Sequence, residues 1–261
     1  MSFSRKQLAI PYIIFLVAFV LAPLLIVVRF AFTDASGNVS FANFLNFFVD
    51  KNAIGTLTYS LGIALTTTIV CLLIAYPTAY ILARGGLKRS SAILVMFVMP
   101  MWINFTLRIT ALKEILTLFE GNLAFHPFLN TVVGMSYDFL PFMILPLYTS
   151  FLKLDKDLNE AAADLGANKT QVFLKVTLPL SVSGIISGVT MVFLPAMTNY
   201  VVLDMLYNST YIMGSLIGSY FSAYDWHSGS VISVVLLIII FIVTIITDKY
   251  GDDTEKRGVA L

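Results

Sequence analysis

Long stretches without a charged residue, separated by short charged segments, run through the chain from end to end. A helix needs about 20 consecutive, mostly apolar residues to cross a bilayer, so each such stretch predicts a membrane-spanning helix. The clearest of these stretches are residues 7–28, 52–83, 90–107, 176–203 and 226–247. Residues 128–152 predict a further span, because they are apolar apart from Asp138.

The pattern therefore predicts an all-α polytopic membrane protein, with residues 1–261 forming a single transmembrane domain. Residues 205–224 are also uncharged, but Asn, Ser, Thr and Gly residues interrupt them. We interpret this stretch as an interfacial or re-entrant segment on the outer side, which leaves six spans in total. Their expected positions are about 8–29, 55–83, 91–111, 130–152, 177–203 and 228–247.

Composition agrees with a membrane protein and excludes several other classes. Hydrophobic residues make up 58% of the 261 residues and charged residues only 12%, whereas soluble domains carry about 25% charged residues. This composition excludes a soluble enzyme, a disordered chain and a nucleic-acid binder, and a net charge of +1 does not attract polyanions. One cysteine and two histidines leave little material for a metal site. We expect no metal, no cofactor within this chain and no catalytic residue.

The basic residues predict the orientation of the spans. With the N-terminus inside, most of the sixteen Lys and Arg residues fall in inner segments, as the positive-inside rule requires. The exceptions are Arg29, Lys51, Arg108 and Lys113. We therefore expect both termini in the cytoplasm. The first apolar run is too long for the hydrophobic region of a signal peptide, so we expect it to be retained as a helix.

The longest inner loop, residues 153–176, joins the fourth span to the fifth and has a helical pattern. The segment Glu160-Ala161-Ala162 consists of residues that strongly favour a helix. Gly166 stands where a left-handed C-terminal cap would end that helix. Asn168 or Thr170 can cap a second helix. Such a compact, alanine-rich loop suits insertion into a groove on a soluble partner.

The same loop carries a long gapped motif. Glu160-Ala161-Ala162 is followed after three residues by Gly166, and after nine more by Val176 and then Leu178-Pro179. This segment resembles the EAA motif of ABC importer permeases, E-A-A-x3-G-x9-I-x-L-P, in which Val176 replaces an isoleucine. A generic alanine-rich loop helix is the alternative interpretation. Against it, the predicted orientation, the number of spans and the motif each independently favour an ABC importer permease.

The resemblance extends over nearly the whole chain and is greatest to the spermidine/putrescine permeases. Arg108, which follows the third-span segment, favours the B-type permease subunit over its C-type partner. The segments that are similar to those of the family are residues 75–77, 99–105, 140–148 and 225–226. Residues 197–200 depart from the family, which usually has a glycine–glutamate pair followed by phenylalanine there. Residues 205–208 replace a leucine-glycine-glycine run.

The resemblance implies a type I ABC importer permease fold, also called MetI-like, in a bacterial cell membrane. The chain would form half of a translocation pathway together with a second permease subunit, two ATP-binding cassette subunits and an extracellular or periplasmic substrate-binding protein. ATP and Mg would bind the partner ATPase, because this chain has no G-x-x-x-x-G-K-[ST] loop. The chain would thus be a transport subunit and not an enzyme. The residues implied in coupling to the ATPase are Glu160, Ala161, Ala162, Gly166, Leu178 and Pro179.

Acidic and aromatic side chains near the spans are candidate contacts for a polyamine, because carboxylates and ring faces attract cations. The candidates are Asp138, Tyr137, Asp204 and Trp102. A charge in the fourth span costs about 2.5–3.5 kcal/mol, so Asp138 is expected to face a cavity or a partner. A shallow, hydrated position is the alternative for Asp138, and the aromatic belt is the alternative for Trp102. We expect Arg108 to serve structure or docking of a binding protein.

Three other functions share fewer of these features. An ABC permease for iron, thiamine or phosphonate would keep the mechanism and change the cargo. A secondary transporter would need intramembrane ion sites and often internal repeats, and only Asp138 offers such a site. A membrane enzyme would need clustered His, Asp or Ser–Lys groups on the spans, and the sequence shows none.

Overall fold

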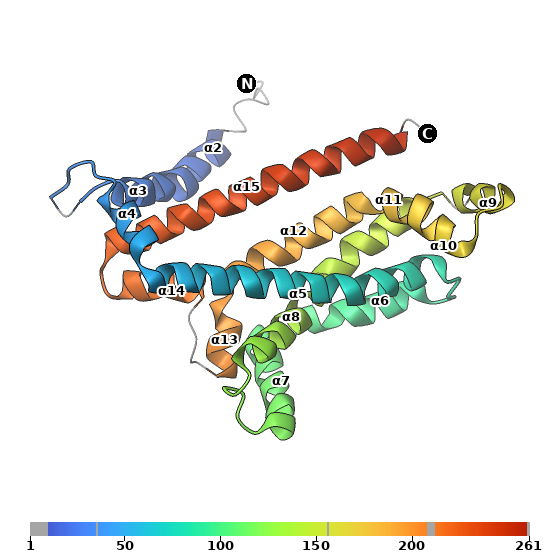
Figure 1. Cartoon of the computed structure of the whole chain (residues 1–261), viewed down its shortest axis with the longest axis horizontal. Coiled ribbons are helices and arrows are strands. Elements are labelled where there is room, and N and C mark those ends of the chain that lie inside the picture. The colour runs from blue at the N-terminus through green and yellow to red at the C-terminus, as the bar shows by residue number, and fades with distance from the viewer. Residues whose placement is uncertain (1–9, 35, 156, 208–211, 260–261) are drawn as a thin grey trace, which may run out of the picture. The chain divides into compact units, whose positions relative to one another are not determined.

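The computed structural model describes residues 10–34, 36–155, 157–207 and 212–259, and in these ranges every named element is a helix. One isolated antiparallel bridge joins Thr33 and Val39. The chain divides into two compact units, and Figure 1 labels the helices of both. The first unit comprises Met1–Thr58 and Met213–Ile239, and the second comprises Tyr59–Ile212 and Ile240–Leu261. The all-α fold class expected from the sequence is confirmed.

The first unit begins with a continuous helical segment of 22 residues, Ile10–Ala31. A π-helical turn precedes Pro23 in this segment, because proline has no backbone N–H to continue the regular hydrogen-bond ladder. The Asp50 side chain accepts a hydrogen bond from the Asn52 backbone N–H at 2.9 Å, just where one helix ends and the next begins. The elements of this unit are α2 (Ile10–Leu16), a π-helix (Val17–Leu21), α3 (Ala22–Ala31), α4 (Ala42–Val49), the start of α5 (Lys51–Arg84), α14 (Met213–Ser222) and the first part of α15 (Trp226–Val259).

The second unit is built around α8 (Pro127–Lys153), which packs against α12 (Val182–Thr198) and against the larger part of α5. The other elements of this unit are α6 (Ser90–Val98), a 3-10 helix (Met99–Trp102), α7 (Phe105–Glu120), α9 (Asp157–Asp164), α10 (Lys169–Val172), a π-helix (Phe173–Thr177), α11 (Leu178–Leu180), α13 (Tyr200–Leu206) and the last part of α15.

Glycines allow α12 to approach α8 closely. Gly184 and Gly188 are four residues apart on α12, the small-xxx-small spacing that is common where membrane helices touch. A Cβ atom on Gly184 would lie 2.5 Å from Ser150 Cβ, and one on Gly188 would lie 2.5 Å from Met143 Sδ. The two backbones therefore pack at a distance that excludes larger side chains at these positions.

The contact between α5 and α8 encloses the single cysteine of the chain. Cys71 on α5 is fully buried, and its thiol lies 3.7 Å from the backbone oxygen of Ser136 on α8. The aromatic rings of Tyr59 and Phe128 meet between the same two helices, with centroids 6.0 Å apart. These contacts join segments that are distant in the sequence into one core.

Four helical segments are long and apolar enough to cross a membrane, namely Ile10–Ala31, Lys51–Arg84, Pro127–Lys153 and Trp226–Thr247. Two bent pairs meet the same criterion jointly. They are Ser90–Trp102 with Phe105–Glu120, bent by 99°, and Lys169–Leu180 with Val182–Thr198, bent by 60°. The described residues thus contain four candidate spans, or the expected six if each bent pair is one span. The span boundaries given above stay predictions.

The region of the third expected span, residues 91–111, differs from the straight helix that its apolar composition favours. Pro100 lies in a 3-10 turn, and Ile103 is extended. Asn104 then caps α7 by accepting hydrogen bonds from the backbone N–H groups of Thr106 and Leu107, at 2.9 and 3.4 Å. The chain therefore breaks after Pro100, and Asn104 caps the new helix that follows in a different direction.

Residues 205–224, interpreted above as interfacial or re-entrant, contain the end of α13 and the whole of α14. Helix α14 has 10 residues, which is too short to cross a bilayer. Residues 208–211 lie outside the described residues, so the path of the complete stretch stays a prediction.

Candidate functional site

The predicted inner loop, residues 153–176, folds as two short helices joined at Gly166. The backbone of Gly166 has a φ of +86°, the left-handed conformation that glycine adopts without steric cost. The Ala167 N–H donates to Ala162 O at 3.1 Å, and the Gly166 N–H donates to Ala163 O at 2.9 Å. This pair of bonds is the Schellman motif, which satisfies carbonyls at a helix end. The left-handed cap expected at Gly166 is confirmed.

The second helix of the loop begins with a capping box. Asn168 Oδ1 accepts a hydrogen bond from the Gln171 backbone N–H, and Gln171 Oε1 accepts one from the Asn168 N–H, both at 2.9 Å. Two backbone donors are thereby satisfied reciprocally. Of the two expected caps, Asn168 rather than Thr170 takes this role. Hydrogen bonds thus close the loop on both sides of Gly166.

Most side chains of the first helix of this loop and of the turn that follows it are exposed to solvent. Glu160 and Ala161 are exposed, Ala162 is half-buried, and the Leu165 side chain is 90% exposed. Within the described part of the chain, the Glu160 carboxylate makes no hydrogen bond and no ion pair. Leu178 and Pro179 follow in α11, where the loop enters the next span. An exposed leucine beside a charge without a partner suits contact with another protein.

Contacts between aromatic rings join the C-terminal end of the loop to α5, and through α5 to α8. The Phe173 ring meets the rings of Tyr76 and Tyr80 edge-to-face, with centroids 5.9 and 6.4 Å apart. The same two tyrosine rings meet Phe151 of α8 at 5.1 and 5.5 Å. The Tyr76 hydroxyl also lies 3.0 Å from Ser181 Oγ, at the start of α12. The rings thus connect the loop to α5, and through α5 to α8 and to the start of α12.

Sequence reasoning did not assign a role to this aromatic cluster, which consists of Tyr76, Tyr80, Phe151 and Phe173. In the sequence, only the spacing of Tyr76 and Tyr80 pointed to this cluster, because residues four apart on a helix share one face. Phe151 and Phe173 come from other segments, and no local pattern places them beside the tyrosines.

A buried ion pair joins α7 to α8. Arg108 Nη2 lies 2.5 Å from Asp138 Oδ1, and both side chains are more than nine-tenths buried. The Arg108 guanidinium also lies 6.0 Å from the centroid of the Phe105 ring. Asp138 therefore faces a partner, as expected for a charge within a span, and that partner is a cation of the same chain.

The guanidinium of Arg108 is only partly satisfied. Its Nε and Nη1 atoms are buried and have no hydrogen-bond partner among the described residues. A buried donor without a partner costs free energy, and more so for a charged group. Among the described residues, the Asp138 carboxylate is the only hydrogen-bond partner of the buried Arg108 guanidinium, so the arginine depends on it.

The four expected substrate contacts do not form a single cluster. Asp138 is buried, whereas Tyr137, Trp102 and Asp204 are exposed, with Trp102 at 82%. Trp102 lies at the break between α6 and α7, and Asp204 lies in α13. No hydrogen bond or ring contact joins Asp138 to these three within the described residues. No group of three or more metal-ligating side chains occurs in that part of the chain either.

Comparison with protein families and curated relatives gives a consistent answer. Residues 2–251 match the family model of the binding-protein-dependent transport system inner membrane component. The spermidine/putrescine transport system permease protein PotB of Haemophilus influenzae is 36% identical over 246 residues, which cover 86% of each chain. The protein of the same name from Escherichia coli is 37% identical over 200 residues, which cover 70% of this chain and 72% of that protein.

Solved structures share the fold at low sequence identity. A bacterial ABC transporter involved in the import of the acidic polysaccharide alginate has a chain that is 16% identical, with a TM-score of 0.67 and coverage of 94% of both chains. The MetNI methionine ABC transporter, in inward-facing conformations, has a chain that is 16% identical, with a TM-score of 0.60. That match covers 77% of this chain and 95% of the other.

Three observations indicate the same family. They are the all-helical fold, the loop capped on both sides of Gly166, and the family match over nearly the whole chain. Such proteins work with the other components of a transport system and have no enzymatic role of their own. The chain belongs to the family of binding-protein-dependent transport system inner membrane components, and it is a multi-pass ABC permease.

Proposed function

We propose that the chain is the permease subunit of an ATP-driven importer of polyamines such as spermidine and putrescine. The identity of 36 and 37% to two spermidine/putrescine permeases, over most of each chain, supports this cargo. In this role the chain forms half of the translocation pathway and pairs with a second permease subunit. Two ATPase subunits bind ATP and Mg, and an extracellular or periplasmic binding protein delivers the substrate.

Both termini lie in the cytoplasm in this proposal, so the loop around Gly166 faces the ATPase subunits. The observation that carries the coupling role is the shape of this loop, a short exposed helix held by caps on both sides of the turn. Closure of the ATPase subunits displaces the loop, and the aromatic cluster passes the displacement to α5 and α8. Rigid-body motion of packed helices then alternates the side on which the pathway opens.

Asp138, Tyr137, Asp204 and Trp102 remain proposed substrate contacts. For Asp138 the ion pair sets a condition, because a polyamine must compete with the Arg108 guanidinium for the carboxylate. The contact therefore belongs to a conformation in which α7 and α8 separate at this point. Asp204 and Tyr137 are exposed in the conformation seen here and meet no such competition.

Replacing Glu160 with alanine is expected to lower ATP-dependent uptake by about 10- to 100-fold, because a hydrogen bond to a charged group contributes roughly 1.5–3 kcal/mol. The folded chain should keep its thermal stability, since this carboxylate has no bond within the described residues. The measurement is uptake into proteoliposomes, together with copurification of the ATPase subunit. Glu114→Ala, at an exposed glutamate in α7, is the matched control and should change neither. Unchanged uptake and copurification in Glu160→Ala would remove the coupling role.

The cargo is tested by transport with the complete system. Proteoliposomes that contain the chain with the other subunits of its transporter are expected to accumulate radiolabelled putrescine and spermidine when ATP and the binding protein are present. An excess of unlabelled polyamine should abolish this uptake, and an excess of thiamine, phosphonate or ferric iron should leave it unchanged. Competition by one of the latter three, without competition by polyamine, contradicts the proposed cargo and keeps the transport mechanism.

A further inference from the structure

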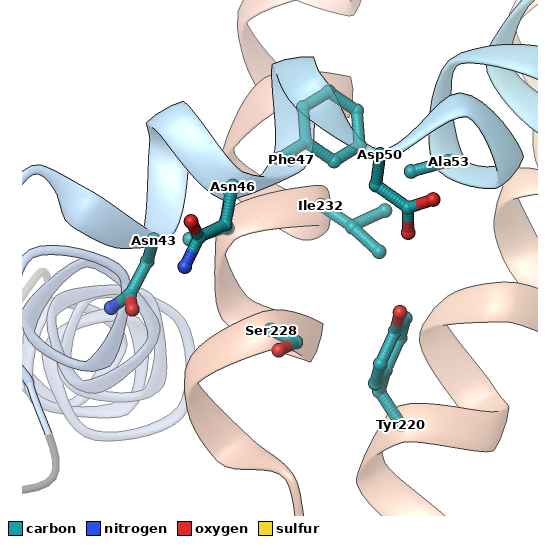
Figure 2. A pocket seen from close by; sticks show the side chains of 9 residues that line it. Asn43, Asn46, Phe47, Asp50, Ala53, Tyr220, Ser228 and Ile232 are labelled. Atoms are coloured by element: carbon teal, nitrogen blue, oxygen red, sulfur yellow. The ribbon is translucent and has the colours of Figure 1, made fainter.

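A pocket of about 160 Å³ lies within the first unit, between α4, the start of α5, α14 and the first part of α15 (Figure 2). Its apolar lining includes Phe47 and Ile232. Its polar lining consists of Asn43, Asn46, Asp50, Tyr220 and Ser228. Among the described residues, no lysine, arginine or histidine lines it, and its one acidic side chain is that of Asp50.

Oxygen atoms that accept hydrogen bonds gather in this pocket. The Asn43 side-chain NH₂ donates to Thr33 O at 2.8 Å, which leaves the Asn43 oxygen as an acceptor. The Asp50 carboxylate accepts from the Asn52 N–H at 2.9 Å and makes no ion pair within the described residues. In Figure 2, the Asp50 carboxylate and the Tyr220 hydroxyl point toward one another across the pocket.

The electrostatic environment of Tyr220 agrees with a pocket that favours positive charge. Burial raises the pKa of the Tyr220 hydroxyl above its ordinary value, and the nearby charges of Asp50 and Asp225 raise this pKa further. The phenol therefore keeps its proton at neutral pH. A cation placed between the phenol oxygen and the Asp50 carboxylate would meet a dipole and a charge of the required sign.

The size and chemistry of the pocket select among ligands. A cavity of about 150 Å³ is known to hold benzene, which has six heavy atoms. Putrescine also has six, in four methylene groups and two amines. A primary ammonium group carries three N–H donors and no acceptor, which matches a lining of acceptor oxygens. An anion would be repelled by Asp50, and an apolar ligand would desolvate this carboxylate without compensation.

We propose that this pocket binds the ammonium end of a short alkylamine or diamine. The ammonium lies between Asp50 and Tyr220, which face each other in Figure 2, and the methylene groups lie against Phe47 and Ile232. Putrescine as the physiological ligand rests on the proposed function. With the N-terminus in the cytoplasm, the pocket follows the first span and faces the outer side, where the cargo arrives.

Calorimetric titration of the transporter without its binding protein tests the site, with n-butylamine and putrescine as probes. Both are expected to bind the wild-type chain, whereas 1-butanol, the neutral analogue, should not. Asp50→Asn is expected to weaken binding of both amines by about 10- to 100-fold, because it removes a charge-assisted hydrogen bond. Asparagine caps a helix as well as aspartate does, so the start of α5 should be kept.

Asp34→Asn is the matched control. The Asp34 carboxylate accepts hydrogen bonds from the Ser36 and Asn38 backbone N–H groups at 2.9 Å, in the same inter-span segment but outside the pocket. This variant should bind both amines like the wild type. Tyr220→Phe, which removes only the hydroxyl, should weaken binding by about three- to tenfold and serves as the test if Asp50→Asn does not fold.

Three results would overturn the site: no amine binding to the wild type, equal amine binding by Asp50→Asn and the wild type, or full displacement of n-butylamine by an equal concentration of KCl. The uptake assay separates this inference from the proposed function. Binding that depends on Asp50, in a transporter that takes up no polyamine, supports the site and contradicts the cargo. Polyamine uptake together with amine binding that is independent of Asp50 contradicts the site alone.

Discussion

Replacing Asp138 with asparagine is expected to destabilise the folded chain more than any other single change considered. The substitution leaves the guanidinium of Arg108, a residue that is only 9% exposed, without its counter-charge. Removing one partner of a buried ion pair costs about 3–5 kcal/mol. For a domain of this size the loss corresponds to a fall of roughly 6–20 °C in the midpoint of thermal unfolding. Asp204→Asn, at an exposed acid in α13, is the control and should leave the midpoint unchanged.

A double variant separates the structural role of the pair from a role in substrate binding. Arg108→Met combined with Asp138→Leu removes both charges, and replacing a buried pair by apolar residues is often neutral or stabilising. We therefore expect the double variant to unfold at about the wild-type temperature. Restored uptake in this variant would contradict Asp138 as a substrate contact, whereas restored stability without uptake would support it. A single Asp138→Asn variant as stable as the wild type would mean that the pair does not hold α7 to α8.

Gly184→Ala is expected to have the second largest effect, because the new methyl group meets atoms that cannot move aside. It would lie 2.5 Å from Ser150 Cβ and 3.1 Å from the backbone oxygen of Pro146. Overpacking of this kind typically costs about 1–3 kcal/mol, and occasionally more. This clash can be relieved only if α12 moves away from α8. The unfolding midpoint and the yield of folded protein should therefore both fall.

Two other glycines supply the comparison for Gly184. A methyl group on Gly188 would meet the flexible Met143 side chain at 2.5 Å, so Gly188→Ala should cost less. A methyl group on Gly62 in α5 would meet only Phe128 Cε2, at 3.9 Å, and alanine is the better helix former by about 0.5–1 kcal/mol. The expected order of midpoints is Gly184→Ala lowest, then Gly188→Ala, then Gly62→Ala. The same midpoint for Gly184→Ala and Gly62→Ala would contradict the close approach of the two helices.

The inner loop was predictable from the sequence because its geometry depends on near neighbours. The cap at Gly166 requires a residue that adopts a positive φ, and the cap at Asn168 requires a side chain within reach of a donor three residues later. Both requirements involve only residues that are a few positions apart in the sequence. The family resemblance and the all-α fold were predictable for a similar reason, since apolar length and motif spacing are properties of single segments.

Features that join distant segments were not predictable in the same way. No local pattern links Arg108 to Asp138, which is 30 residues further along the chain, and the available signal was that charges inside a membrane commonly pair with each other. The 99° bend before α7 coincides with the 3-10 turn at Pro100, the extended Ile103 and the capping Asn104, within a stretch whose composition is largely apolar. The pocket brings Asp50 together with Tyr220 from the opposite end of the chain, and no periodicity links the two.

The burial of Cys71 makes the native chain a ready background for labelling with thiol probes. This residue is the only cysteine in the sequence, and it is fully enclosed between α5 and α8. A maleimide reagent therefore meets no exposed native thiol on the folded chain. A cysteine introduced at the exposed Leu165 would be the single accessible one, and its rate of modification would report whether a partner covers the inner loop.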